Sequence, residues 1–253
     1  MTELEATFAL WKREVTVYFR ERERIIASIV SPIMWIVLFG TGLGASVEVQ
    51  GYNYQQFMFP GIVSMAVLFT SVFYGIYVIW DRKLDVLKAV LVAPVSRAAV
   101  FFGKLLGGCT ESMLQGLVVL LLGLGIGISF TPFSFALAFL LLLPLSLLMV
   151  SIGLVIGSNL RTQEAFNLVI NFVMWPMFFL SGALFPTSNL PAWLAALTYI
   201  NPLSYGVDAL RGAILGPTVQ RLPLYVDLTA MLFFTLLGFW IGIVSFGRMQ
   251  QTK

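Results

Sequence analysis

Charged residues that interrupt long apolar stretches are the positions where this sequence could do chemistry. The stretch KLDVLKAVLVAPVSR, residues 83–97, is too charged to cross a bilayer and too apolar for an ordinary solvent loop. One helical face holds three leucines, Leu84, Leu87 and Leu91. The other faces hold three charged residues, Asp81, Asp85 and Lys88. Pro94 disfavours helical geometry at Ala93. The pattern predicts an amphipathic helix over 81–93 that either lies on the membrane or docks into a groove of another protein.

Glu111 is an acid inside a long apolar block, seven residues after Lys104. Seven helical residues rise about 10 Å, which places Glu111 one third of the way into the bilayer if Lys104 lies at its surface. An acid at that depth is a candidate for a functional role. Alternatively, Glu111 pairs locally with Lys104, with Gln115 or with a backbone group.

The residue types of the commonest enzyme sites are missing. The chain has no histidine and one cysteine, Cys109, which argues against a His- or Cys-based metal site and against a Ser-His-Asp triad. No GxxxxGK[ST] phosphate-binding loop occurs. We therefore expect no catalytic residues, no metal or cofactor bound by this chain, and no nucleic-acid partner.

Long apolar blocks must position these residues. The 253-residue chain is 59% hydrophobic and 11% charged, whereas a soluble domain carries about a quarter charged residues. Six blocks are long enough to be spanning helices: 25–47, 58–80, 99–130, 133–157, 166–185 and 227–247. These features predict an all-α integral membrane protein with one transmembrane domain over 1–253.

The basic residues predict the orientation of the spans. Thirteen of the 15 lysines and arginines lie before the first block, at the junction of the second and third, or after the fourth or sixth. Arg211 and Arg221 fall on the opposite side. Because cytoplasmic segments are enriched in Lys and Arg, we expect six spans with both termini cytoplasmic, including a short tail over 248–253.

Two further segments are expected at the membrane surfaces. Segment 1–24 predicts a cytoplasmic amphipathic helix, which either anchors the chain or also contacts a cytoplasmic partner. Four apolar residues form its stripe: Phe8, Trp11, Val15 and Phe19. On the other side, 186–226 holds two apolar runs that are too short to span and are separated by Asn201–Pro202, which predicts two re-entrant half-helices. Asp208 and Arg211 either pair on one helical face or contact substrate.

Small residues predict how the spans pack. Gly153–Gly157 and Gly238–Gly242 have the four-residue spacing that lets helices approach closely. These glycines serve either packing within the chain, which we favour, or a dimer seam. Four prolines predict kinks or breaks within or at the ends of spans: Pro32, Pro60, Pro144 and Pro176.

Two motifs resemble a known family. LKAVLVAPVSRAAVFFGK at 87–104 is similar to the loop after the second span of ABC type-2 exporter permeases. FFLSGALFPTSNLPAWLAALTYINPLSYGVDALRG at 178–212 resembles the segment before their last span. The likeness covers nearly the whole chain, and among family members it points to the daunorubicin-resistance and nodulation lipo-oligosaccharide export subunits.

The resemblance implies a half-transporter. Two such subunits, identical or close paralogues, would lie on two copies of a cytoplasmic ATPase subunit that binds ATP and Mg²⁺. The segment after span two would be a coupling helix that contacts the ATPase, together with the N-terminal helix. Its residues are Asp81, Leu84, Asp85, Leu87, Lys88, Leu91, Pro94 and Arg97. The half-helices would cap the outer end of the path, through Trp193, Asn201, Pro202, Tyr205, Asp208 and Arg211.

These features together predict the permease subunit of an ABC exporter in a prokaryotic plasma membrane. The substrate class that suits aromatic and aliphatic spans is an amphiphile: a lipid-linked glycan, a lipo-oligosaccharide or a hydrophobic drug. The chain itself is not expected to be an enzyme. The alternative is a self-sufficient channel or an ion-coupled secondary transporter that uses Glu111.

Overall fold

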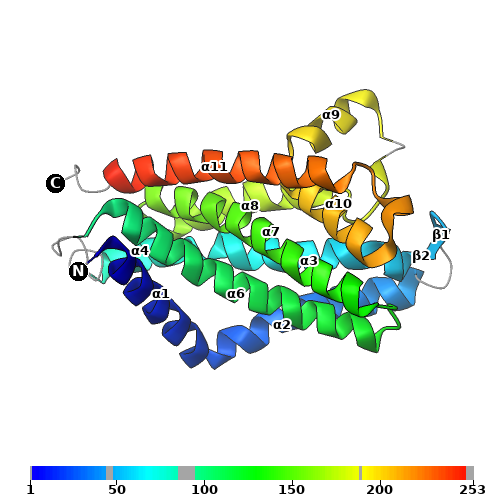
Figure 1. Ribbon diagram of the computed structural model, residues 1–253, viewed down its shortest axis with the longest axis horizontal. Helices are drawn as coiled ribbons and strands as arrows, with labels where there is room; N and C mark the ends of the chain where they lie inside the picture. Colours follow the sequence, from blue (N-terminus) through cyan, green and yellow to red (C-terminus); the bar gives the residue numbers. More distant parts are fainter. Residues whose placement is uncertain (1, 44–47, 85–94, 188–189, 249–253) are drawn as a thin grey trace.

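The computed structural model describes residues 2–43, 48–84, 95–187 and 190–248, and it is almost entirely helical, as the sequence predicts. Most of the helices run along the long axis of the molecule (Figure 1). The N-terminus and the end of the last helix lie at one end, and a short β-hairpin lies at the other. We call these the termini end and the hairpin end.

The elements have the following bounds: α1 Glu3–Arg20, α2 Arg22–Leu43, β1 Glu48–Val49, β2 Tyr52–Asn53, α3 Tyr54–Phe73, α4 Ile76–Lys83, α6 Arg97–Gly125, α7 Pro132–Asn159, α8 Gln163–Phe179, α9 Ala192–Ile200, α10 Pro202–Leu215, the 3-10 turn η2 Pro217–Val219 and α11 Leu224–Arg248. Polar side chains begin several of the helices by accepting a bond from a free backbone N–H: Thr2, Asn53, Ser96, Thr131, Thr162 and Asn201.

Within the described residues, five stretches are long and apolar enough to cross a membrane: Arg22–Gly40, Tyr54–Lys83, Arg97–Gly125, Pro132–Asn159 and Leu224–Arg248. The sixth expected span, 166–185, corresponds to α8, which has 17 residues. Its length is therefore about 25 Å, against about 30 Å for a hydrocarbon core. The sixth span thus remains a prediction.

Helix α3 forms the centre of the bundle, packed against α2, α6, α7, α8 and α10. Phe57, Phe59 and Val67 on three of its sides are all fully buried. Helices α2, α8 and α11 lie at the periphery and expose large apolar side chains, such as Leu38, Phe172 and Trp240. A wide apolar outer surface suits contact with lipid.

Glycines allow the central helices to cross closely. A Cβ on Gly153 would lie 2.6 Å from the carbonyl oxygen of Val72, and a Cβ on Gly157 would overlap the backbone of Gly75. Gly238 packs against Ser151, and Gly242 packs against Phe101, so closely that a Cβ on either glycine would overlap the neighbouring side chain. Both glycine pairs therefore serve packing within the chain, the alternative that the sequence favoured.

Several boundaries differ from the sequence-based expectation. The predicted N-terminal helix over 1–24 ends at Arg20, and α2 begins at Arg22, so the first span starts earlier than expected. The small antiparallel hairpin β1–β2 was not expected; its turn uses Gln50 and Gly51, both with positive φ. The two half-helices form as α9 and α10, separated at Asn201 as predicted.

Candidate functional site

A buried group of ionisable side chains joins three helices at the termini end. Lys104 of α6 is 1% exposed; its Nζ donates to Glu14 Oε1 of α1 at 3.2 Å and forms an ion pair with Asp81 of α4. Arg13 of α1 donates to Asp81 Oδ1 at 2.9 Å. The Tyr74 hydroxyl donates to Glu14 Oε2 at 2.9 Å. We call these five residues the Lys104 cluster.

The Lys104 cluster balances its formal charge, since two carboxylates face one ammonium and one guanidinium. The hydrogen bond to Asp81 raises the pKa of Arg13, so this guanidinium stays charged. Removing one partner from a buried ion pair typically costs about 3–5 kcal/mol, because the other charge is left uncompensated. The cluster therefore resists any separation of α1, α4 and α6.

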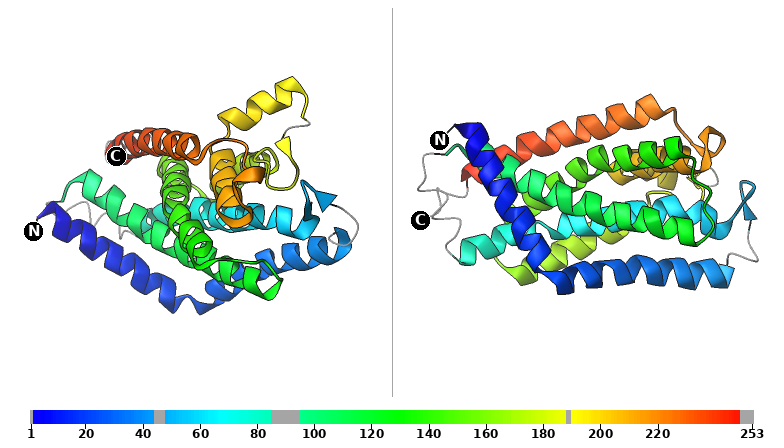
Figure 2. Two further views of the ribbon diagram at one scale, coloured as in Figure 1. Left: turned by 45° about the vertical axis from the view of Figure 1, so that its right-hand side comes forward. Right: turned by 60° about the horizontal axis from the view of Figure 1, so that its bottom comes forward.

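Two glycines bring α1 close enough to form the cluster. Leu10, Glu14 and Tyr18 recur every four residues along α1 and so share one helical face. A Cβ on Gly103 of α6 would lie 2.6 Å from Leu10 Cβ, and one on Gly107 would lie 2.5 Å from Glu14 Cβ. Helix α1 thus crosses α6 at its glycines, obliquely to the other helices (Figure 2, right).

Asp81 does not lie where the sequence predicted. It was expected on a charged face of the coupling helix, available to a partner, but it is 7% exposed and points to Lys104 and Arg13. The physical reason is that α4 prolongs the second span as far as Lys83, so Asp81 belongs to the bundle. A buried lysine at 104 also requires a counter-ion.

A second ionic contact lies about two helical turns further along α6. Arg24 of α2 forms ion pairs with Glu111 and with Glu21, the latter at 3.3 Å. Arg24 also donates to the hydroxyl of Tyr77, whose ring lies 4.6 Å below the guanidinium carbon. Tyr77 in turn donates to Glu21 Oε2 at 2.6 Å. The Glu111 side chain is 4% exposed, so it is Arg24, and not solvent, that pairs with this carboxylate.

This arrangement corrects the expected local partners of Glu111. Lys104 is engaged by the carboxylates of its own cluster, not by Glu111. The Gln115 amide instead binds α2: its Nε2 donates to the Ser28 carbonyl at 2.9 Å, and its Oε1 accepts from the Ser28 hydroxyl at 2.7 Å. The sequence distance between Arg24 and Glu111 explains why a search for local pairs missed this contact.

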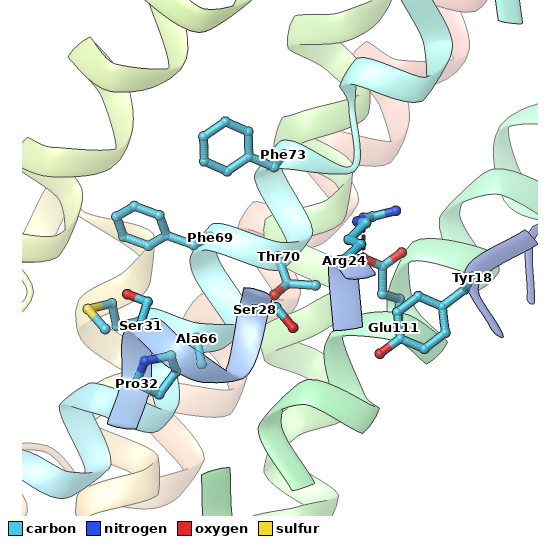
Figure 3. A pocket seen from close by; sticks show the side chains of 11 residues that line it. Tyr18, Arg24, Ser28, Ser31, Pro32, Ala66, Phe69, Thr70, Phe73 and Glu111 are labelled. Atoms are coloured by element: carbon cyan, nitrogen blue, oxygen red, sulfur yellow. Dashed lines mark hydrogen bonds and ion pairs between the residues drawn. The ribbon is translucent and has the colours of Figure 1, made fainter. Parts of the chain in front are cut away.

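The Arg24–Glu111 pair lines a cavity of about 230 Å³ between α1, α2, α3 and α6, which we call the Arg24 cavity. Its lining residues are Tyr18, Arg24, Ser28, Ser31, Pro32, Met65, Ala66, Phe69, Thr70, Phe73 and Glu111. Figure 3 shows Arg24, Glu111 and Tyr18 gathered at one side, and Phe69 and Phe73 at another. The cavity therefore has a charged end and an aromatic wall.

The flanks of the predicted coupling segment are tied to other helices. The Ser96 backbone N–H donates to Glu3 Oε1 of α1 at 3.2 Å, and Arg97 Nη1 donates to the carbonyl of Gly247 in α11 at 2.7 Å. Leu84 is 73% exposed. The remaining predicted coupling residues lie outside the described residues: Asp85, Leu87, Lys88, Leu91 and Pro94.

The expected apolar stripe of the N-terminal helix is divided between packing and exposure. Phe8 and Phe19 are exposed, 58% and 56%, and Val15 is half-buried. Trp11 donates from Nε1 to the Thr110 hydroxyl of α6 at 3.0 Å. The helix therefore uses one face for the bundle and leaves aromatic rings outward, as an interfacial helix would.

At the hairpin end, Asp208 and Arg211 do not form the expected ion pair. Asp208 instead accepts bonds from the backbone N–H groups of Arg221 and Leu222, each at 2.8 Å. Arg211 donates to the carbonyl of Gly182 at 2.7 Å and lies over the ring of Phe57, 4.3 Å from its centre. None of the ion pairs found among the described residues joins the two.

The other half-helix residues have structural contacts. Asn201 caps α10 through the Leu203 N–H and donates to the Met177 carbonyl at 2.7 Å, which fixes α10 to α8. Pro202 occupies the first turn of α10, where its missing N–H costs nothing. The Tyr205 hydroxyl donates to the Tyr199 carbonyl at 2.7 Å, and Trp193 is 68% exposed.

Sequence reasoning missed several members of the ionic groups at the termini end: Arg13, Glu14, Arg24, Tyr74 and Tyr77. One signal was available for Glu14, which interrupts an apolar row of i, i+4 residues, Leu10 and Tyr18, and so predicts a buried acid that needs a partner.

The sequence is similar to those of known membrane proteins. The family model for the ABC-2 type transporter matches residues 5–215. The inner membrane transport permease YadH of Escherichia coli (strain K12) is 26% identical over 250 residues, covering 95% of this chain and 94% of the relative. Nodulation protein J of Neorhizobium galegae is 24% identical over 244 residues, covering 95% and 92%. Nodulation protein J of Rhizobium meliloti (strain 1021) is 25% identical over 248 residues, with the same coverage.

Proposed function

The chain belongs to the ABC-2 type transporter family as a transport permease, and we propose that it is the membrane-spanning subunit of an exporter driven by a separate ATPase. Two copies of this chain, or this chain and a close paralogue, would assemble above two ATPase subunits. The mechanism needs a path by which closure of the ATPase subunits reaches the spans.

The position of the Lys104 cluster is the observation that carries this proposal. Helix α4, which holds Asp81, ends at Lys83, and α6, which holds Lys104, begins at Arg97, so the helices on both sides of the predicted coupling segment contribute to the cluster. The cluster ties both of these helices to α1 through Asp81, Lys104 and Glu14. A displacement of the segment would therefore move α1, α4 and α6 together.

ATP and Mg²⁺ are proposed to bind to the ATPase subunits, where hydrolysis supplies the free energy for closure. In the parts of this chain that the structure describes, no group of three or more Cys, Asp or Glu side chains is arranged to hold a metal ion. The chain's own contribution is mechanical: its buried ion pairs hold three helices in fixed relation, and α1 adds an interfacial contact.

The Arg24 cavity supports an amphiphile as the transported substrate. Its aromatic wall, with Phe69 and Phe73, suits an acyl chain or ring system. Its other end offers the Arg24–Glu111 pair, which can bind a polar head group, and Ser28 lies between the two ends (Figure 3). Lipid-linked glycans, lipo-oligosaccharides and hydrophobic drugs all combine an apolar part with a polar part.

The charge distribution supports a plasma-membrane location with the termini end in the cytoplasm. The Lys104 cluster, Arg24 and Arg161 all lie at the termini end, as the positive-inside rule expects. A cysteine at Arg161, in a Cys109→Ala background, should react with an impermeant reagent only after cells are opened. A cysteine at Thr218, near the hairpin end, should react in intact cells; the reverse pattern would reject this orientation.

Co-purification with a candidate ATPase, followed by reconstitution in vesicles, tests the proposed function. The complex should hydrolyse ATP faster when an amphiphilic substrate is added, and transport should stop when ATP is withheld. Leu84→Asp should weaken this ATPase complex while insertion survives, because the exposed Leu84 lies beside the coupling segment. Transport by the chain alone, driven by an ion gradient without ATP, would reject the proposal in favour of an ion-coupled carrier.

The rival carrier would use Glu111 as its coupling group. The Arg24–Glu111 ion pair argues against this role, because a fixed cation already compensates the carboxylate. The Glu111→Gln variant distinguishes an ion-coupled carrier from an ATP-driven exporter. It should abolish transport in an ion-coupled carrier, and it should leave ATP-dependent transport measurable in an exporter.

A further inference from the structure

A second cavity, far from the Lys104 cluster, lies at the hairpin end and has a volume of about 150 Å³. We call it the Arg211 cavity. Its wall comes from the start of α3, the segment before residue 188, α10, and the chain between α10 and α11. The residues that matter to its chemistry are Phe57, Thr187, Asp208, Arg211, Thr218 and Arg221.

Two guanidinium groups of this cavity carry buried N–H donors without a hydrogen-bond partner among the described residues. Arg211 is 6% exposed; its Nη2 donates to the Gly182 carbonyl, but its Nε has no partner. Arg221 donates from Nη1 to the Thr198 hydroxyl at 2.9 Å and to the Thr187 hydroxyl at 3.5 Å, and its guanidinium lies over the ring of Tyr199. Its Nε and Nη2 have no hydrogen-bond partner among the described residues. A buried donor without a partner is costly, above all on a charged group.

Asp208, the acid in the cavity, accepts no hydrogen bond from these donors, although its charge raises the pKa of Arg211 against the larger effect of burial. Both oxygens of the Asp208 carboxylate accept backbone N–H bonds from Arg221 and Leu222, so the carboxylate serves the turn before α11. The nearby Asp227 accepts from the Gln220 amide at 2.9 Å. Burial lowers the pKa of Arg211 to about 10, which leaves the guanidinium protonated at neutral pH.

We propose that the Arg211 cavity binds a phosphate group through Arg211 and Arg221, whose guanidinium groups turn toward the anion so that their unpartnered N–H groups donate to it. A guanidinium presents N–H groups in a fixed fork that matches the oxygens of a phosphate. The cavity is several times the volume of one water, about 30 Å³, and so admits a single oxyanion. The Thr187 and Thr218 hydroxyls line the same space and can donate as well. The phosphate is either a free anion or the head group of an outer-leaflet lipid.

A bound phosphate would add a link between α9, α10 and the chain that enters α11; of these, α9 packs least against α10. Arg211 belongs to α10, and Arg221 belongs to the chain that enters α11 and contacts Thr198 of α9. An anion that binds both arginines would fix the outer half-helices against the last span. The inference concerns the permease alone, so its failure would leave the proposed ATP-driven transport untouched.

Thermal unfolding of the purified permease tests the site. In detergent, inorganic phosphate should raise the unfolding temperature saturably relative to chloride at equal ionic strength. Arg221→Gln should weaken the apparent phosphate affinity about tenfold or more, because it removes charged donors. Arg161→Gln removes an exposed arginine at the termini end and should leave the affinity unchanged. In nanodiscs, phosphatidylglycerol added to phosphatidylcholine provides the lipid arm of the test.

The two arms identify the source of the phosphate. Stabilisation by inorganic phosphate identifies a free anion, and stabilisation by phosphatidylglycerol alone identifies a lipid head group. If Arg221→Gln does not fold, Thr218→Trp serves instead, because the indole fills the cavity while Arg221 keeps its own contacts; the phosphate response should again be lost. The proposal is overturned if neither phosphate source stabilises the wild type, or if the variant that folds responds as the wild type does.

Discussion

The two ends of the bundle bury ionic groups in different ways. At the termini end, the two cations Lys104 and Arg13 neutralise the carboxylates of Glu14 and Asp81 across three helices. At the hairpin end, Asp208 accepts backbone N–H bonds and Arg211 binds a backbone carbonyl and an aromatic face. Ion pairs between helices fix how the helices lie relative to one another, whereas bonds to the backbone fix a turn. The first arrangement suits an element that transmits motion, and the second suits a cap.

The largest expected effect comes from breaking the termini-end cluster. Lys104→Met leaves Glu14 and Asp81 buried with Arg13 as their sole described cation, and it should lower the free energy of unfolding by about 3–5 kcal/mol. Lys12→Met is the matched control, since Lys12 is exposed on the same helix as Glu14. Unfolding in mixed micelles measures both. Equal stability of the two variants would show that the cluster does not fasten the helices.

A smaller effect is expected at the hairpin end. Asp208→Ala removes the acceptor of the Arg221 and Leu222 N–H groups and should cost about 1–3 kcal/mol. Because Asp208 and Arg211 are not paired, exchanging the two charges should not restore the stability that either single reversal removes. The free energies of unfolding of the two single reversals and the double reversal form a double-mutant cycle that measures this. If the double reversal regained the stability lost in the single reversals, the two ends of the bundle would use the same kind of contact.

The Arg24–Glu111 pair is intermediate between the two ends, since the Arg24 side chain is 29% exposed. Arg24→Gln should therefore destabilise less than Lys104→Met, by about 1–2 kcal/mol. Because the pair lines the Arg24 cavity, the same variant should change which amphiphiles stimulate ATP hydrolysis. Unfolding and a substrate panel measure the two effects. An unchanged panel would remove this cavity from the substrate path.

The smallest effect is expected on the outward face of α1. Phe8 is 58% exposed and contacts Trp11 on its own helix, so Phe8→Ser should change the free energy of unfolding in detergent by less than about 0.5 kcal/mol. Trp11→Leu, which removes the bond to Thr110, should cost more. A Phe8→Ser variant that unfolds as easily as Lys104→Met would show that this face also packs within the bundle.

The sequence predicted the elements better than the contacts between them. Hydropathy located five of the six predicted spans, and Asn201–Pro202 located the break between the half-helices, because both signals are local. The partners of Glu111 and Arg211 could not be predicted, because each depends on which distant helix lies alongside. Asp81 shows the same limit: it belongs to a charged local pattern, yet its place is decided by Lys104 on another helix. The coupling helix predicted over 81–93 remains a prediction, since residues 85–93 lie outside the described residues.

Distances between spin labels in the assembled transporter test the central claim most directly. In a Cys109→Ala background, labels at Lys12 on α1, Lys83 on α4 and Leu168 on α8 are all at exposed positions. If the Lys104 cluster makes α1 and α4 move as one unit, trapping ATP on the ATPase should leave the Lys12–Lys83 distance unchanged while the Lys12–Leu168 distance changes. A Lys12–Lys83 distance that changes as much as the Lys12–Leu168 distance would contradict the account.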